Sequence, residues 1–237
     1  TAVNLAAYLA VGGLRVLLVD LDPQNFATRC LGLDVQNVRC SLADVFLEER
    51  PMQDAIVPTG VPGLSIVPAD RRLASSDVLL ADVAGREKIL KGRIDELRNR
   101  YDHILIDNPP SLNLLTINAL IASDNYVITV SPSFVSVAGL QSLLETVEAI
   151  KKNMHSKVEL LGILPTMVDF RMKITAEIID LLRSHFKEKV FKTVIRHNVK
   201  LLEAPSHGQT IFEYDSGSMG ALCYIYFGKE FLSRCRS

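Results

Sequence analysis

Residues 15–24 read Arg-Val-Leu-Leu-Val-Asp-Leu-Asp-Pro-Gln, and this stretch decides the fold. Its apolar run contains valines, which are β-branched, and lacks the strict alternation of a half-buried strand. Such a run predicts a strand covered on both faces, as in a parallel sheet. A helical pattern over residues 1–11 comes before it, and Gly-Gly at 12–13 is natural at a helix end. The stretch therefore predicts a helix that leads into a buried strand, which ends in two carboxylates, Asp20 and Asp22.

Apolar runs of the same kind recur along the chain. They predict strands at Arg15–Val19, Leu64–Val67, His103–Ile106, Tyr126–Val130 and Leu160–Leu164. Helical patterns lie between them, at Ser41–Glu48, Ser76–Arg98, Ser111–Ile121, Val137–Lys152, Ile174–Phe186 and Gly217–Arg234. Ser41 and Ser111 are predicted to cap their helices. This alternation predicts an α/β fold with a doubly wound, mostly parallel sheet and helices on both faces. With no internal repeat or obvious linker, one domain over residues 1–237 is the simplest interpretation.

Composition favours a folded protein of the cell interior. The chain has 237 residues, of which 48% are hydrophobic and 22% charged, so a sizeable core is expected and disorder is not. No apolar run is long enough to cross a bilayer, and no signal peptide is visible. None of the four cysteines forms a CxxC pair, which favours buried or idle thiols over metal or redox use. We therefore expect a cytoplasmic location and no membrane partner.

Charge is distributed unevenly along the chain. The net charge of −1 argues against a wholly basic nucleic-acid binder. Residues 1–150 hold 12 basic and 18 acidic side chains, whereas residues 151–237 hold 14 and 9. The second part can therefore present a basic face, although solvated helix surfaces explain the same count.

Carboxylates follow two of the predicted strands. The first strand ends in Asp20, and the run His103–Ile106 leads into Asp107-Asn-Pro-Pro-Ser111. In open α/β sheets, ligands bind outside the carboxyl ends of the strands. An apolar strand ending in Asp is the Walker B pattern, whose carboxylate serves the water shell of Mg²⁺. Either aspartate alone is often a cap or turn residue, but the two together predict a magnesium site.

Four segments, in one order and nearly end to end, resemble the ParA/Soj partition ATPases of the deviant Walker A P-loop class. They are Asp20-Leu-Asp22-Pro-Gln24, Asp107-Asn-Pro-Pro-Ser111, Thr166-Met167-Val-Asp169-Phe-Arg171 and Leu201-Leu-Glu203-Ala-Pro205-Ser-His207-Gly208. The resemblance implies a P-loop NTPase-like fold that hydrolyses ATP with Mg²⁺. It further implies an ATP-dependent homodimer that binds double-stranded DNA without sequence specificity. A ParB-type centromere-binding partner would stimulate turnover, at a chromosome or plasmid, in a nucleoid-associated cytoplasmic protein.

The family's phosphate loop, Lys-Gly-Gly-x-Gly-Lys-Thr-Thr, would end just before or at Thr1. Its amides and lysines carry most phosphate binding, so the sequence as numbered is expected to lack the first strand and the loop, and to bind ATP poorly. The resemblance assigns Thr1 and Pro109 to the nucleotide site, with Pro109 in the second switch. It places Met167 and Asn198 near the adenine base.

The same resemblance assigns the chemistry and the DNA contacts. Asp22 matches the carboxylate that orients the attacking water, while Asp20 and Asp107 match positions near the magnesium shell. Arg171 and Lys200 stand where the family places basic contacts to DNA phosphates, which carry no sequence information. Candidate neighbours of this DNA-binding set are Lys173, Lys192 and Arg196. The family usually has Pro at position 196, so the geometry there is expected to differ. His207 matches a fixed turn and is expected to be structural.

Two other interpretations remain at the sequence level. One is a catalytically inactive, loop-less module that binds DNA or a partner. The other is a MinD-like membrane regulator, anchored through the last helix. The aromatic residues of that helix, Tyr224, Phe227 and Phe231 among them, are instead expected to close the core, and its basic residues are few for a lipid-binding face.

Overall fold

The computed structural model describes residues 1–236, with residues 134–136 described only as part of a helix. Two compact units are present. The first contains Thr1–Ser123 and Glu203–Tyr214, and the second contains Asp124–Leu202 and the chain from Asp215 on. The assignment of residues 1–237 to a single ATPase domain stays a prediction.

The first unit is built on a four-stranded sheet. Its strand order is β2 (Val57–Pro58), β3 (Leu64–Val67), β1 (Val16–Asp20) and β4 (His103–Asp107). Strand β1 runs parallel to both of its neighbours, and only the short β2 is antiparallel. The sheet is therefore mostly parallel, as the apolar runs predict.

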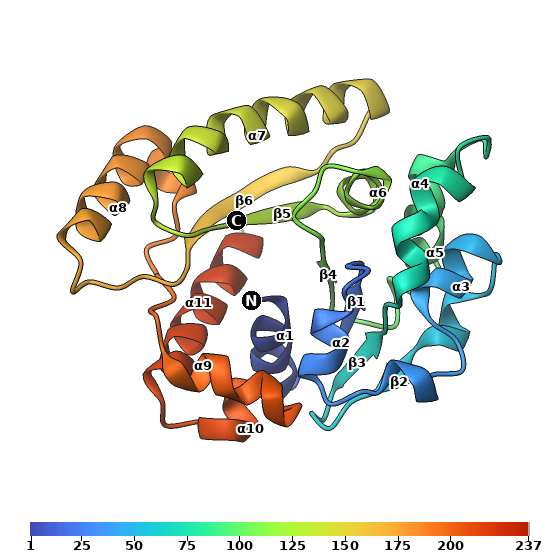
Figure 1. The fold of residues 1–237 in the computed structure, drawn as a ribbon, viewed down its shortest axis with the longest axis horizontal. Helices are drawn as coiled ribbons and strands as arrows, with labels where there is room; N and C mark the ends of the chain where they lie inside the picture. Colours follow the sequence, from blue (N-terminus) through green and yellow to red (C-terminus); the bar gives the residue numbers. More distant parts are fainter. Residues whose placement is uncertain (237) are drawn as a thin grey trace. The chain divides into compact units, whose positions relative to one another are not determined.

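Helices cover both faces of this sheet (Figure 1), where α1 and α3 lie on opposite sides of β1. All five residues of β1 are buried. Leu17 and Val19 belong to a core cluster that includes residues of α3 (Leu42–Leu47), α5 (Ile89–Asp95) and α6 (Leu114–Ala122). Side chains alternate along a strand, so the other residues of β1 face α1 (Ala2–Val11), which packs on this strand. A strand buried on both faces needs no polar alternation.

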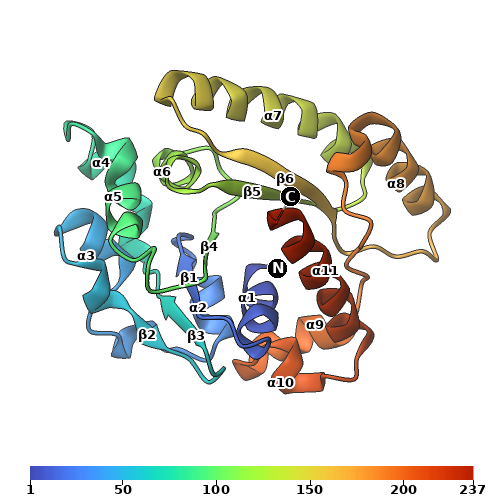
Figure 2. The same ribbon diagram turned by 180° about the vertical axis from the view of Figure 1, so that it is seen from behind.

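The second unit contains a parallel pair of strands, β5 (Asn125–Val130) and β6 (Glu159–Pro165). Helices α7 (Phe134–Met154) and α8 (Lys173–Phe186) follow these strands in the chain, and Figure 2 shows the same elements from behind. Six buried side chains form the centre of this core: Val130, Leu140, Ile163, Ile178, Leu182 and Val190.

The last helix, α11 (Met219–Cys235), closes the core of the second unit. Tyr224, Phe227 and Phe231 are buried, which confirms the expectation for this helix. Phe227 meets the ring of Phe191 edge-on at 5.1 Å between centroids. Arg234 donates from its guanidinium to three backbone oxygens at 3.0–3.1 Å, those of Leu161, Glu188 and Val190. None of the helices in the described part of the chain combines the length and apolar character that a membrane span requires.

Most predicted elements are confirmed, and two details are wrong. All five predicted strands form, with small shifts at their ends. The predicted helix over Ser76–Arg98 is broken into α4 (Ser76–Leu79) and α5, with Gly85 at a φ of +77° between them. Helix α6 is capped by Asn113 and not by Ser111, because the Asn113 side chain accepts from the Thr116 amide at 3.3 Å. The Ser41 cap is confirmed.

Short helices without a periodic apolar pattern escape prediction. They are α2 (Phe26–Cys30), α9 (Val199–Glu203), α10 (Ile211–Asp215) and the 3₁₀ turns. Each depends on packing against neighbours more than on its own sequence.

Candidate functional site

Asp20 and Asp107 lie side by side at the carboxyl ends of two adjacent parallel strands. They are direct partners in the register of β1 and β4. The Leu21 amide donates to the Asp107 carbonyl at 2.9 Å, so the pairing continues one residue beyond β1. The structure thus brings together the two strand-end carboxylates that the sequence separates by 87 positions.

The carboxylate of Asp20 is fully buried and held by three hydrogen bonds. Its Oδ2 accepts from the Thr28 amide at 2.8 Å and from the Thr28 hydroxyl at 2.7 Å. Its Oδ1 accepts from the Asp22 amide at 3.2 Å. Burial raises the pKa of Asp20 to about 6 although these bonds oppose the rise, and the charge of Asp107 adds to it. The orientation of this side chain is therefore fixed while its charge is poorly solvated.

Asp107 has the same electrostatic character. It is half-buried in the strand, and burial raises its pKa above the ordinary value, with the charge of Asp22 adding to the rise. Two neighbouring carboxylates with raised pKa values are stabilised when a cation comes between them. Oxygen donors of this kind suit Mg²⁺.

The donor set fits Mg²⁺ bound jointly with phosphate. Among the described residues, no group of three or more His, Cys, Asp or Glu side chains could hold a metal ion by itself. Mg²⁺ typically keeps several waters and uses one or two carboxylates together with substrate phosphates. Asp20 and Asp107 match that pattern, and their metal role stays a prediction.

Asp22 lies in the turn that follows β1. Its side chain is partly exposed, and its Oδ1 accepts from the Gln24 amide at 2.9 Å. The Asn25 amide donates to the Asp22 carbonyl at 2.8 Å, and Asn25 itself takes a left-handed conformation with φ of +50°. The turn therefore holds the Asp22 carboxylate in place while leaving it accessible, as a residue that positions a water requires.

Thr1 and Pro109 lie at the same end of the sheet. Thr1 is the N-cap of α1, which leads directly into β1 and runs opposite to it. Pro109 is partly exposed, two residues after β4. The amino end of a helix favours negative charge, so phosphate is well accommodated beside this end of the sheet.

Thr28 is a site residue that sequence reasoning misses. It is fully buried, donates its hydroxyl to Asp20 and accepts from the Ala69 amide at 3.2 Å. Thr28 therefore links Asp20 to the segment after β3. The available signal is a polar residue inside the apolar surroundings of Phe-Ala-Thr, eight positions after the aspartate.

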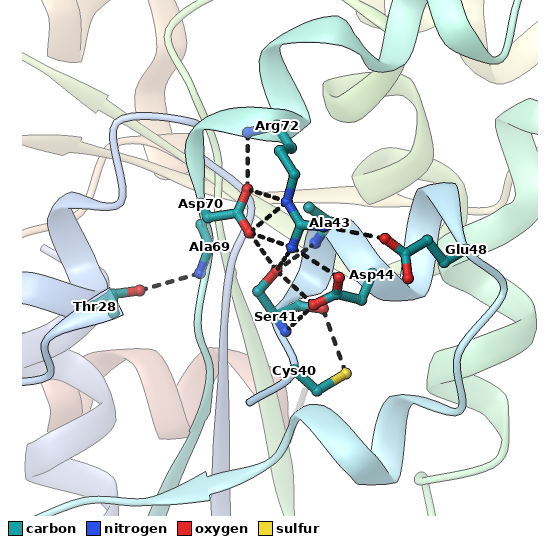
Figure 3. Close-up of polar contacts among 9 residues, drawn as sticks. All are labelled: Thr28, Cys40, Ser41, Ala43, Asp44, Glu48, Ala69, Asp70 and Arg72. Atoms are coloured by element: carbon teal, nitrogen blue, oxygen red, sulfur yellow. Dashed lines mark hydrogen bonds and ion pairs between the residues drawn. The ribbon is translucent and has the colours of Figure 1, made fainter. Parts of the chain in front are cut away.

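The segment next to Ala69 is held by a polar network around Arg72 (Figure 3). The Arg72 guanidinium pairs with Asp70 at 2.7 Å and with Asp44 at 2.7 Å. The Ser41 hydroxyl donates to Asp70 at 2.7 Å, while Ser41 also caps α3. The network fixes the amino end of α3 to the end of β3, so the amide that bonds Thr28 belongs to a well-restrained segment.

The second unit contains an open hollow of about 400 Å³. Two segments distant in sequence meet there, because the Val168 amide donates to Ile195 and the His197 amide donates to Val168, both at 3.0 Å. The hollow is lined by Asp169, Arg171, His197, Asn198, Val199 and Lys200. Three of the predicted binding residues, Arg171, Asn198 and Lys200, are thus brought together.

The remaining predicted residues of this unit lie outside the lining of the hollow. Lys173 begins α8, and Lys192 is exposed while its amide donates to Glu230 at 2.9 Å. Arg196 is exposed, with its guanidinium 5.0 Å from the centre of the Phe170 ring. Met167 is exposed and has a φ of +56°. The DNA and adenine roles of these residues stay predictions.

His207 belongs to a packed turn in the first unit. Its ring stacks on Tyr214 at 5.0 Å between centroids, and the Tyr214 hydroxyl donates to Glu203 at 2.9 Å. Gly208 follows with φ of +63° and lies against Gly32. These contacts support a structural role for His207.

Comparisons with known proteins identify the family to which this chain is similar. The protein-family model described as AAA domain matches residues 1–160. The chain is 43% identical, over 97% of its length, to sporulation initiation inhibitor protein Soj of Bacillus subtilis (strain 168), and it covers 91% of that protein. The chain belongs to the ParA/Soj family. Chromosome partitioning protein ParA of Myxococcus xanthus (strain DK1622) is 38% identical over 99% of the chain, which covers 83% of that relative.

A solved structure shows the same fold. The crystal structure of cobyrinic acid a,c-diamide synthase from Mycobacterium smegmatis, with bound ATP analog and magnesium, superposes with a TM-score of 0.85 at 29% identity. The match covers all of this ParA/Soj family chain and 89% of the other. The α/β, P-loop NTPase-like fold class is therefore confirmed.

Proposed function

We propose that this ParA/Soj family member is a partition ATPase that binds and hydrolyses ATP with Mg²⁺. The proposal is carried by the register that sets Asp20 beside Asp107 at the end of the sheet, with Asp22 in the following turn. Catalysis of phosphoryl transfer consists mainly of positioning and charge stabilisation, so a few well-placed carboxylates suffice on the protein side.

Each carboxylate has one task in the proposed site. Asp20 and Asp107 would hold Mg²⁺ directly or through its waters, with Asp20 oriented by Thr28. When bound, the metal would neutralise charge on the phosphates. Asp22 would accept a hydrogen bond from the attacking water and align it, a role that its partial exposure permits.

Hydrolysis by the full-length protein tests the catalytic part of the proposal. We expect Asp22→Ala to lower the hydrolysis rate by about 100-fold or more while nucleotide binding persists, because only the positioning of water is lost. Asp82→Ala is the matched control, since Asp82 is exposed in the same unit. A normal rate in Asp22→Ala removes this role. Binding without any hydrolysis in the wild type favours the inactive-module alternative.

The proposed partners are double-stranded DNA, a second copy of the chain in the ATP state and a ParB-type protein that stimulates turnover. The location follows as cytoplasmic and nucleoid-associated. The hollow lined by Arg171, His197 and Lys200 supports the DNA part, because such side chains contact phosphates regardless of sequence.

Binding to unrelated duplexes in the presence of ATP and magnesium tests the DNA part. Arg171→Ala and Lys200→Ala should weaken binding to every duplex alike. Lys157→Ala removes one exposed positive charge from the same unit and serves as the control. Equal losses in all three variants would contradict a local DNA site.

The membrane-regulator alternative has less support. The aromatic side chains of α11 needed for a lipid-binding face are largely buried in the core. Co-sedimentation with anionic liposomes, but not with DNA, would favour that alternative.

A further inference from the structure

Arg171 is already engaged by a carboxylate of its own loop. The Arg171 Nε lies 2.9 Å from Asp169 Oδ1, and its Nη2 lies 2.6 Å from Asp169 Oδ2. The Arg171 amide donates to the same Oδ1 at 3.0 Å. The pair is therefore bidentate, which is the geometry in which guanidinium binds both carboxylate and phosphate most strongly.

The two partners differ in exposure. The Arg171 side chain is 83% exposed and the Asp169 side chain 23%. Asp169 directly follows Val168, which is tied by backbone hydrogen bonds to Ile195 and His197. The carboxylate is thus fixed to a braced segment, while the guanidinium at the end of a long side chain is able to move away.

The pair adds little to the stability of the fold. Exposed ion pairs contribute little to stability, since water and salt replace them readily. The bond with Arg171 holds the pKa of Asp169 at about 2, so this carboxylate stays charged at neutral pH. A pair that contributes so little to stability exchanges readily when another anion competes for the guanidinium.

The position of the pair indicates what that other anion is. Asp169 supplies the one carboxylate among the lining residues of the hollow in the described chain, where Arg171, His197 and Lys200 are also found. A DNA phosphate would compete with Asp169 for the same guanidinium N–H groups. The carboxylate would also repel that phosphate through space.

We infer that Asp169 limits the affinity of this surface for nucleic-acid phosphates by occupying Arg171, which must exchange one anion for the other upon binding. The inference rests on the proposed DNA-binding function. It makes Asp169 an affinity-setting residue, which keeps the protein readily released from DNA.

Asp169→Asn tests the inference in the full-length protein with ATP and magnesium. The amide oxygen of asparagine is able to accept from the Arg171 backbone, so the turn is kept. We expect affinity for duplex DNA to rise about three- to tenfold. The slope of log K against log salt should become steeper by about one, as for one added phosphate contact.

Two controls isolate the pair. Asp180→Asn removes the same charge from an exposed position on α8, and it should change affinity much less. In an Arg171→Ala background, Asp169→Asn should lose most of its effect, because no guanidinium remains to be released. Thermal unfolding should show that all variants remain folded.

The outcomes distinguish failure of the inference from failure of the proposed DNA-binding function. Unchanged or weaker DNA binding by Asp169→Asn, in a protein whose wild type binds DNA and whose Arg171→Ala variant binds it more weakly, overturns the inference and leaves the proposed function standing. The same gain in Asp180→Asn also overturns it, since it would reflect net charge alone. If neither the wild type nor Asp169→Asn binds DNA, the proposed DNA-binding function fails and the inference fails with it.

Discussion

Thr28 is the residue through which the candidate magnesium site meets the rest of the first unit. Its hydroxyl donates to Asp20 at 2.7 Å and accepts from Ala69 at 3.2 Å, with all three groups buried. Partners of this kind orient a metal-binding carboxylate without touching the metal. The geometry assigns Thr28 to positioning.

Replacing Thr28 by valine removes the hydroxyl but keeps the shape. We expect a loss of about 1–3 kcal/mol in unfolding free energy, because the Ala69 amide is left without its acceptor. We also expect half-maximal ATPase activity to need about tenfold more Mg²⁺ with a smaller change in kcat. A magnesium titration of the hydrolysis rate measures this. Thr28→Ser retains the hydroxyl and should restore the magnesium dependence; if valine changes only stability, Thr28 is merely structural.

The buried charge of Asp20 predicts a pH dependence of stability in the metal-free protein. Its pKa is raised in the folded state to about 6, above the unfolded value, so the folded state binds a proton more readily. The penalty for this charge is therefore fully present above the folded pKa and disappears as the pH falls towards 4. A shift of this size corresponds to about 2–3 kcal/mol.

Denaturant unfolding in the presence of a chelator measures that penalty. Asp20→Asn cannot ionise, so its stability relative to the wild type should be highest near pH 7.5 and should fall as the pH approaches 4, whatever constant cost the loss of one acceptor oxygen adds. A difference that stays constant between these pH values would show that ionisation of Asp20 carries no such penalty.

At the scale of elements, the turn after Pro205-Ser-His depends on a glycine. Gly208 has φ of +63°, and a Cβ there would lie 2.6 Å from the Gly32 Cα, a backbone atom that cannot move aside cheaply. Gly208→Ala should therefore lower the unfolding free energy by about 2–4 kcal/mol, through the left-handed conformation and the clash together.

Gly92 provides the matched control for that substitution. It lies within α5, and a Cβ there meets nothing within 4 Å. Gly92→Ala should raise stability by about 0.5–1 kcal/mol, because alanine favours the helix. Equal melting temperatures for the two variants would contradict the close approach of Gly208 to Gly32.

The elements also show what sequence predicts well. The strands are recognisable because short, β-branched, largely apolar runs favour covered strands, as in Val16–Val19 and in Leu64–Val67 with its single Ser65. The break within residues 76–98 is not recognisable, since it depends on a distant partner. That partner is Asn118, whose buried side chain accepts a hydrogen bond at 3.0 Å from the amide of Leu90, the second residue of α5.

The candidate site likewise has features that sequence predicts and features that it does not. The adjacency of Asp20 and Asp107 is predictable, because parallel strands end at a common edge. The role of Thr28 and the pairing of Arg171 with Asp169 depend on side-chain geometry that spacing does not encode. The resemblance to ParA/Soj proteins points to Arg171 without showing which anion already occupies it.

At the scale of the whole molecule, residues 1–150 and residues 151–237 differ in net charge. Residues 151–237 carry five more basic than acidic side chains, whereas residues 1–150 carry six more acidic ones. A protein with a net charge of −1 should therefore bind DNA through one part only, and counterion release should make that binding sensitive to salt.

The salt dependence of DNA affinity measures how many phosphates are contacted. With three to five contacts, we expect log K to fall with log salt at a slope of about −3 to −4.5. Lys200→Ala should make the slope shallower by about one, whereas Lys157→Ala should leave it unchanged. A flat response would exclude phosphate contacts as the main source of affinity.

The residue-for-residue pairing of β1 with β4 limits which deletions this protein can tolerate during evolution. Side chains alternate between the faces of a strand, so deletion of a single residue within either strand would turn all the following side chains over. Leu21 or Asn108 would then occupy a place now held by a carboxylate. Length variation among descendants of this chain should therefore be confined to the connecting loops, and a one-codon deletion scan should find the ten strand positions intolerant.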